Sequence, residues 1–213
     1  MTYTLFYAPG TASLCVHWML IELGVGFRAE LVDLDGGAQR SADYLRLNPQ
    51  GRVPTLAIGE AAYGESAALL MLLAERHVEA GFAPAPGEAG RERWLETMVY
   101  LANNLSPAFR DWFYAGKDGS SECAAHVQAL ARTKIERVWD RFDAMLADGR
   151  PYLLGEQVTT ADFLATMLMR WSRNMERPAT TWPRIGPYVQ RMRARPAFLE
   201  LCRREGLTEW LNP

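Results

Sequence analysis

The sequence predicts an α/β domain at the N-terminus followed by a larger all-helical domain. Over residues 1–79, apolar positions switch between the two-residue period of strands and the three-to-four-residue period of helices. A segment rich in proline and glycine follows, and only helical periods occur after it. The 213 residues, 49% hydrophobic and 23% charged, suit a globular chain of one large domain or two small ones.

Two strands and a helix open the predicted N-terminal domain. A short apolar strand at residues 4–7 ends at Ala8-Pro9-Gly10, and helical spacing then runs from Ser13 until Gly24 stops it. Alternating residues at 27–34 predict the second strand. A crossover of this length joins parallel neighbours, so we expect these two strands to pair in parallel.

The remaining elements of this domain predict a mixed sheet. Residues 38–47 predict a short helix, residues 53–58 and 61–63 predict two strands around a turn, and residues 65–77 predict a long apolar helix. The resulting order is strand, helix, strand, helix, strand, strand, helix, and it predicts a small α/β domain over residues 1–79.

Residues 80–88 are the predicted linker, because 80–87 contain two prolines and two glycines. Residues 89–213 predict the helical domain, with one long helix marked by apolar positions from 127 to 146. Thr159, followed three residues later by Asp162, predicts an N-cap with a capping box. Pro183 and Pro196 mark the starts of further helices.

Composition argues against several classes of protein. A formal net charge of −2 provides no field that attracts nucleic acid, and no apolar run reaches the roughly 18 residues that cross a bilayer. The first residues carry no secretory signal. The three cysteines and three histidines are too widely spaced for a disulfide framework or a metal site. We therefore expect a cytoplasmic protein that binds neither nucleic acid, membrane nor metal.

Two loop motifs of the first domain are candidates for ligand binding. The turn from Tyr7 to Ser13 lies beyond the carboxyl end of a strand, where open α/β sheets bind ligands, although a plain helix cap is the commoner role of such a serine. The second motif is Arg52-Val53-Pro54. A cis bond before Pro54 would turn the Val53 backbone toward a ligand, whereas a trans bond would make this an ordinary strand start.

The third motif is Gly64-Glu65-Ser66 at the start of the long apolar helix. Free backbone N–H groups and the Ser66 hydroxyl suit a carboxylate there, and Glu65 suits an ammonium group. The alternative is a capped helix with an acidic first turn.

The order and spacing of these motifs resemble the glutathione transferase superfamily, nearest to its bacterial beta-class branch. The similarity covers nearly the whole chain: F-Y-x-P-G-x-x-S at residues 6–13, N-P-x-G-x-V-P-x-L at 48–56, E-S-x-A-L at 65–69, the Pro-rich linker, and V-T-T-A-D at 158–162. The resemblance implies the glutathione transferase fold, with an α/β thioredoxin-like N-terminal domain that binds glutathione. It also implies an all-α C-terminal domain that binds a small hydrophobic electrophile, a homodimer, and no metal.

The resemblance also implies which residues bind glutathione. The Val53 backbone would pair with the cysteinyl part, and Pro54 would be the family's cis-proline. Glu65 and Ser66 would hold the γ-glutamyl ammonium and carboxylate, with Arg52 beside this set.

This chain departs from the beta-class pattern at three places. Ala12 stands where beta-class members carry a cysteine, which excludes thiol–disulfide exchange at that position. The family lysine after the second strand is replaced, and Gln39 or Arg40 could reach the same carboxylate. Either Ser106 or Asn103 stands at the place of the beta-class histidine.

The departures leave open what ionises the glutathione thiol. A helix N-terminus and a hydroxyl bonded to the thiolate together lower a thiol pKa by roughly two units. Ser13 is the predicted hydroxyl, and Tyr7 is the alternative. We expect Cys15 to be a buried structural cysteine and His17 to be a packed residue rather than a general base.

The predicted co-substrate pocket contains Asn103, Ser106, Phe109, Trp112 and Phe113. Its aromatic rings suit a planar electrophile, although at least half of them could instead be helical core. The predicted activity is conjugation of the glutathione thiolate to small hydrophobic electrophiles. The alternatives are a glutathione-dependent isomerase, dehalogenase or etherase using the same site, and a non-catalytic ligand- or partner-binding protein of the same fold.

Overall fold

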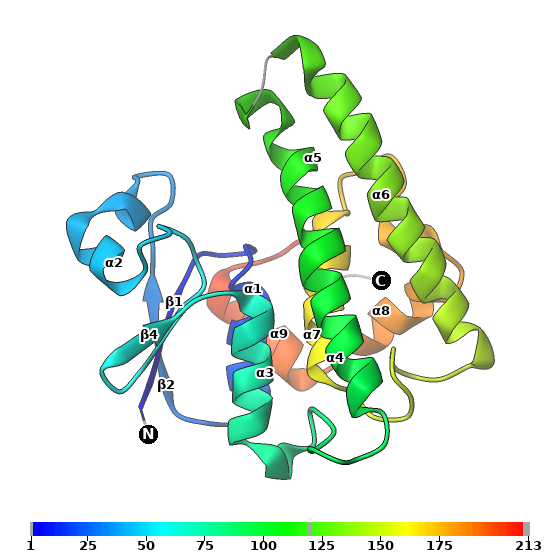
Figure 1. Ribbon diagram of the computed structural model, residues 1–213, viewed down its shortest axis with the longest axis horizontal. Coiled ribbons are helices and arrows are strands. Elements are labelled where there is room, and N and C mark those ends of the chain that lie inside the picture. Colours follow the sequence, from blue (N-terminus) through cyan, green and yellow to red (C-terminus); the bar gives the residue numbers. More distant parts are fainter. Residues whose placement is uncertain (1, 119–120, 211–213) are drawn as a thin grey trace. The chain divides into compact units, whose positions relative to one another are not determined.

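A four-stranded mixed sheet organises the N-terminal part of the chain in the computed structural model, which describes residues 2–118 and 121–210 (Figure 1). Its strands are β1 (Tyr3–Tyr7), β2 (Phe27–Leu31), β3 (Thr55–Ile58) and β4 (Ala61–Tyr63), in the order β2-β1-β3-β4. β1 pairs in parallel with β2, whereas the β1–β3 and β3–β4 pairs are antiparallel. The predicted parallel pair and the mixed sheet are both confirmed.

β1 begins at Tyr3, one residue before its predicted start, and two other strands have bounds that differ for local reasons. β2 ends at Leu31 rather than at residue 34, since the chain turns at Asp33, whose carboxylate accepts the Gly36 N–H at 2.9 Å. β3 begins at Thr55 rather than at residue 53, because Pro54 has no N–H to donate to a strand ladder.

The α-helices that accompany the sheet are α1 (Leu14–Glu22), α2 (Ala42–Leu47), α3 (Ser66–Arg76) and α9 (Pro196–Glu205), and the short 3-10 helices are Ala38–Arg40 and Val78–Ala80. α1 packs against α3 and α9, on the opposite side of the sheet from α2 (Figure 1). Because it is covered on several sides, α1 is buried continuously from Leu14 to Leu20.

The chain divides into two compact units, and the last helix belongs to the same unit as the sheet. One unit contains the residues up to Ala83 and those from Arg193 onward, and the other is Pro84–Met192. The sequence instead placed α9 in the helical domain. The packing of α9 on α1 explains the difference, since the Phe198 and Trp18 rings meet edge to face at 4.8 Å.

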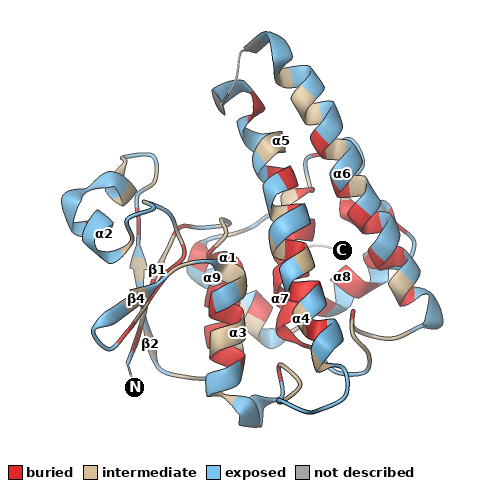
Figure 2. Cartoon of the chain, viewed as in Figure 1, coloured by how far each residue is buried: buried red, intermediate tan, exposed pale blue. Residues whose placement is uncertain are grey.

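Helices make up the second unit: α4 (Arg91–Tyr100), α5 (Ser106–Asp118), α6 (Ala124–Met145), α7 (Thr160–Trp171) and α8 (Ile185–Arg193), with a π-helical turn at Leu101–Leu105 and 3-10 turns at Ser121–Cys123, Leu146–Asp148 and Ala179–Thr181. α5 packs against α6. The buried positions of α6 recur every three or four residues along one face (Figure 2). The helical spacing seen in the sequence from residue 127 therefore reports one long amphipathic helix.

The start of α7 has the predicted capping box. The Thr159 N–H donates to Asp162 Oδ2 at 2.7 Å, and the Leu153 N–H donates to Asp162 Oδ1 at 2.9 Å. Burial is the largest influence on this carboxyl group and raises the pKa of Asp162. Pro196 is the first residue of α9, as predicted. Within the described residues, no helix is both long and apolar enough to span a membrane.

Candidate functional site

The turn between β1 and α1 is closed by the side chain of Ser13. The Ser13 hydroxyl donates to the Ala8 carbonyl at 3.1 Å and accepts the Ala8 N–H at 3.2 Å. Thr11 reinforces this closure, since its hydroxyl donates to the same carbonyl at 2.7 Å and lies 3.0 Å from Ser13 Oγ. Ser13 is fully buried. Its hydroxyl is therefore engaged in holding the turn.

A buried carboxylate from the far end of the chain also holds this turn. Glu205, in the last turn of α9, accepts the Gly10 N–H at 2.8 Å through Oε2. Its Oε1 lies 2.8 Å from Nδ1 of His17, and both side chains are buried. A carboxylate oxygen only accepts, so the imidazole donates through Nδ1–H, whereas its Nε2 has no hydrogen-bond partner among the described residues. His17 is a packed residue, as expected.

Tyr7 lies at the end of β1 beside this buried pair. Its ring meets the His17 ring edge to face at 4.9 Å. Partial burial raises the pKa of the Tyr7 hydroxyl, and the negative charge of Glu205 raises it further. The hydroxyl therefore stays protonated at neutral pH and can donate. No hydrogen bond to it is found within the described part of the chain.

The second motif is held by its neighbours in a way that leaves Val53 unpaired. The Val53–Pro54 bond is cis, as the family resemblance implied. The preceding Arg52 carbonyl accepts from Asn48 Nδ2 at 2.9 Å and from the Tyr44 hydroxyl at 2.8 Å. Neither the N–H nor the C=O of half-buried Val53 has a partner within residues 2–118 and 121–210. Both groups are available to pair with an extended ligand.

The third motif begins α3 and lies against the other two. Glu65 is exposed and has a left-handed backbone with φ of 66°, a conformation that costs a non-glycine residue about 1–3 kcal/mol and is concentrated at functional sites. The next residue, Ser66, donates its hydroxyl to the Ala12 carbonyl at 2.7 Å. A Cβ placed on Gly64 would lie only 3.8 Å from the Pro54 carbonyl oxygen. The three motifs therefore meet at one edge of the sheet.

Gln39 and Arg52 border the same edge. The Gln39 amide donates to the Leu34 carbonyl at 3.2 Å, and its Oε1 is buried without a partner among the described residues. A Cβ on Gly51 would lie 3.0 Å from the Gln39 carbonyl oxygen, so the 3-10 helix that carries Gln39 lies against the second motif. The Arg52 side chain is exposed.

Cys15 is fully buried, as expected for a structural cysteine. Burial raises the pKa of its thiol to about 12, and its Sγ donates to the Ala12 carbonyl at 3.6 Å. Such a thiol is protonated and unreactive at neutral pH. In the described part of the chain, no cluster of His, Cys, Asp and Glu side chains could hold a metal ion.

In the second unit, the five predicted co-substrate residues have different surroundings. Phe109 is fully buried and its ring contacts Phe113, Trp139 and Trp171, so the structure places it in the core. Phe113 is 49% exposed and stacks on Phe109 at 6.0 Å. The other three lie on the same helical stretch, with Trp112 and Ser106 half-buried and Asn103 exposed.

Three residues of these surroundings were missed by the sequence analysis: Thr11, Trp171 and Glu205. The sequence position of Glu205 did indicate an unusual role. This residue lies in the last turn of α9, just before the Gly206 cap, where the helix dipole disfavours a carboxylate. An acidic residue at such a position indicates that something other than the helix stabilises it. Thr11 and Trp171 left no comparable signal, because a turn threonine and a helical tryptophan are ordinary at their positions.

The site offers a specific set of contacts. The start of α3 provides N–H groups and the Glu65 carboxylate, which suit the carboxylate and ammonium of an amino-acid end. The Val53 backbone suits a peptide group. A thioredoxin-like domain with these motifs, joined to an all-helical unit, defines the class of glutathione-dependent transferases.

Comparison with known proteins identifies the family. The family domain described as "Glutathione S-transferase, N-terminal domain" matches residues 12–76, and "Glutathione S-transferase, C-terminal domain" matches residues 107–196. The chain is 31% identical to glutathione S-transferase GST-4.5 of Xanthomonas campestris over 209 residues, covering 95% of this chain and 98% of that protein. The chain belongs to the glutathione S-transferase family.

Two solved structures are similar over nearly the full length. The sphingomonad glutathione S-transferase complexed with glutathione has a TM-score of 0.84 at 29% identity, covering 96% of this chain and 100% of that one. The bacterial beta-class enzyme of Sphingomonas chungbukensis has a TM-score of 0.83 at 29% identity, with the same two coverages. These similarities are consistent with the bacterial beta-class branch that the motifs indicated.

Proposed function

We propose that this protein binds glutathione at the three motifs and transfers its thiolate to small hydrophobic electrophiles. The observation that carries the proposal is the meeting of the unpaired Val53 backbone with the strained Glu65 and the start of α3. The glutathione complex of the sphingomonad relative supports glutathione as the ligand.

Each part of glutathione has a proposed partner. The γ-glutamyl carboxylate binds the N–H groups at the start of α3, and the γ-glutamyl ammonium binds Glu65. The Ser66 hydroxyl joins this carboxylate by rotating away from the Ala12 carbonyl, to which it donates in the structure. The Val53 backbone pairs with the cysteinyl peptide group. Gln39 and the exposed Arg52 are the nearest candidates for the glycyl carboxylate, because they border the same edge.

Thiol activation is proposed to depend on Tyr7, with Ser13 holding the turn. Tyr7 keeps its proton at neutral pH and has no described hydrogen-bond partner, whereas the Ser13 hydroxyl is engaged with Ala8. A hydroxyl bonded to a thiolate contributes about 1.5–3 kcal/mol, which lowers a thiol pKa by roughly one to two units. Ala12 offers no sulfur, so the glutathione thiolate reacts with the electrophile and forms no mixed disulfide there.

The electrophile is proposed to contact the helical unit. Phe113 presents an exposed aromatic face, and Trp112 beside it is half-buried, which suits a planar, apolar molecule. Ser106 and Asn103 remain alternative polar contacts. We also propose that the protein acts as a cytoplasmic homodimer, which light scattering of the purified protein would test.

A glutathione titration across pH tests the proposal. The ultraviolet absorbance of the bound thiolate should report a pKa of about 6–7, roughly two units below the free thiol. Turnover with a chlorinated dinitrobenzene should then follow thiolate formation. Tight binding with an unshifted thiol would contradict a transferase and favour a ligand-binding role.

Three tyrosine and serine variants separate the roles of the two hydroxyls. Tyr7→Phe should raise the thiol pKa and reduce turnover, whereas Ser13→Ala should chiefly lower stability. Tyr63→Phe is a matched control, because Tyr63 is 46% exposed on β4. If Ser13→Ala raised the thiol pKa and Tyr7→Phe did not, the assignment would be reversed.

A further inference from the structure

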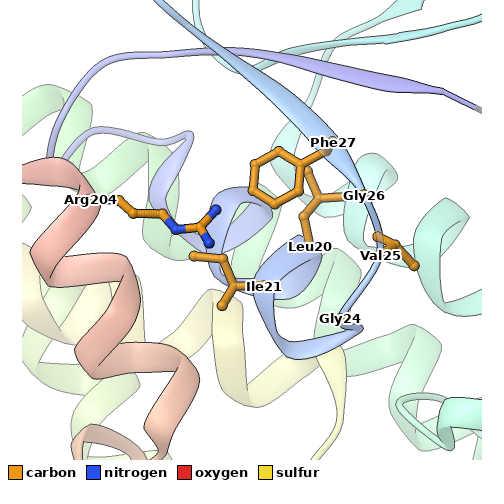
Figure 3. A pocket seen from close by; sticks show the side chains of 7 residues that line it. All are labelled: Leu20, Ile21, Gly24, Val25, Gly26, Phe27 and Arg204. Atoms are coloured by element: carbon orange, nitrogen blue, oxygen red, sulfur yellow. The ribbon is translucent and has the colours of Figure 1, made fainter.

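A small pocket opens at the end of α1 that the proposed glutathione site does not use. It has a volume of about 270 Å³, and its lining comes from the end of α1, the turn that follows, the start of β2, and α9 (Figure 3). Phe27 at this end of β2 pairs with Tyr3, at the opposite end of β1 from Tyr7. The pocket and the Ser13 turn are thus at opposite ends of α1, about 12 Å apart along the helix.

Arg204 provides the charged group of this pocket. Its guanidinium points from α9 toward the Phe27 ring, with Cζ 5.6 Å from the ring centre (Figure 3). Nε donates to Glu200 at 2.7 Å, which fixes the direction of the guanidinium. Within the described residues, the two terminal nitrogens have no hydrogen-bond partner. They form the planar pair of donors that binds a carboxylate.

The charge around Arg204 favours an anion. Glu200 is the acidic partner of Arg204, and it is shared with Arg203, whose Nε donates to it at 2.7 Å. Two guanidinium groups and one carboxylate leave one positive charge in this cluster. The carboxylate of the neighbouring Glu205 is bonded to the buried His17 and to Gly10 rather than to Arg204.

The remaining walls combine apolar side chains with the polar backbone of residues 24–26. Ile21 and Phe27, both half-buried, provide hydrocarbon and ring surface (Figure 3). A Cβ added to Gly24 or Gly26 would meet no atom within 4 Å, so these glycines border open space. The volume lies just below the usual range of ligand pockets, which suits one or two fused rings. We infer that this pocket binds a small aromatic carboxylate, with the ring against Phe27 and the carboxylate on Arg204.

Calorimetric titration with 2-naphthoate tests this site in the intact protein. We expect one saturable equivalent, unchanged when glutathione is present at saturation. Arg204→Gln should weaken binding about tenfold, because it removes a charge-assisted pair of hydrogen bonds. Arg203→Gln is the matched control, since Arg203 also pairs with Glu200 but does not line the pocket.

A second variant tests the location without removing a charge. Gly26→Met adds a side chain to the pocket wall at a position with no steric neighbour and no left-handed backbone, so the fold should persist. It should abolish naphthoate binding while leaving glutathione binding intact. 2-Naphthalenemethanol, which has the ring without the charge, should bind at least tenfold more weakly than the acid.

Three results would overturn the inference: no saturable binding, displacement of naphthoate by glutathione, or equal binding by Arg204→Gln, Gly26→Met and the unaltered protein. Displacement by glutathione would place the acid in the proposed catalytic site instead. Because the probe for this pocket is not glutathione, an absence of naphthoate binding leaves the transferase proposal unchanged. An absence of glutathione binding or turnover likewise leaves the pocket proposal unchanged.

Discussion

Removing the Glu205 carboxylate should loosen the turn that carries Tyr7 and Ser13. Glu205 accepts the Gly10 N–H and the His17 Nδ1–H, each at 2.8 Å, and its side chain is buried. Hydrogen bonds to charged groups contribute about 1.5–3 kcal/mol each, and breaking a buried pair costs about 3–5 kcal/mol. We therefore expect Glu205→Ala to lower the free energy of unfolding by about 3–5 kcal/mol, a large part of a typical total of about 5–15 kcal/mol.

Urea unfolding measures this loss. With a slope of about 2 kcal/mol per molar urea, the midpoint should fall by roughly 1.5–2.5 M. Glu205→Gln should be milder, at about 1–2 kcal/mol, because an amide oxygen can still accept from Gly10 while its NH₂ group cannot accept from His17. Glutathione affinity should fall in both variants, since the turn borders the proposed site.

Glu200→Gln is the matched control for this measurement. Glu200 lies on the same helix and pairs only at the surface, with Arg203 and Arg204. Its midpoint should stay at that of the unaltered protein. If Glu205→Ala unfolded at the same urea concentration as this control, Glu205 would not be holding the turn.

Three other predictions follow from described contacts. Asp162→Asn should lower the free energy of unfolding by about 2–4 kcal/mol, because its buried carboxylate accepts from Leu153, Thr159 and Tyr188; an unchanged thermal midpoint would refute this. The pKa of Cys15 is raised from 9.0 to about 12, so the thiol contributes stability that is complete below about pH 9 and is lost as the pH rises toward 12. Cys15→Ala should flatten the stability profile measured by urea unfolding over that range, and an unchanged slope would contradict the burial argument. Glu65→Gly relieves a left-handed backbone, so the free energy of unfolding should rise by about 1 kcal/mol. The glutathione affinity measured by calorimetry should fall at least tenfold, and an unchanged affinity would remove Glu65 from the proposed site.

Most of the fold could be predicted from the sequence, because the residues that end helices and strands and the spacing of apolar residues are local features of the chain. Gly24 ends α1, and Pro196 begins α9. Apolar spacing identifies the buried face of a helix, but it does not specify which element covers that face. The sequence therefore predicted α9 as a helix without showing that it packs on α1.

The candidate site was likewise predictable where it depends on local motifs, and not where it depends on long-range contacts. Cis-Pro54, Glu65 and Ser66 lie in short motifs whose spacing is visible in the chain, and the structure brings them together. The surroundings of Ser13 were not predictable, because a hydroxyl at a helix start can point to its own turn or to a ligand with equal local cost. The Glu205 contact with Gly10 spans 195 residues, far beyond the reach of any local pattern.

That long contact gives the protein an order of assembly during synthesis. The turn around Gly10 is made early, but its buried acceptor is in the last turn of the last helix. A ribosome must therefore complete the whole helical unit before the turn acquires its final support. A chain released early would lack the carboxylate that holds the turn in place. α9 thus links the quality of the proposed glutathione site to synthesis of the chain as far as Glu205.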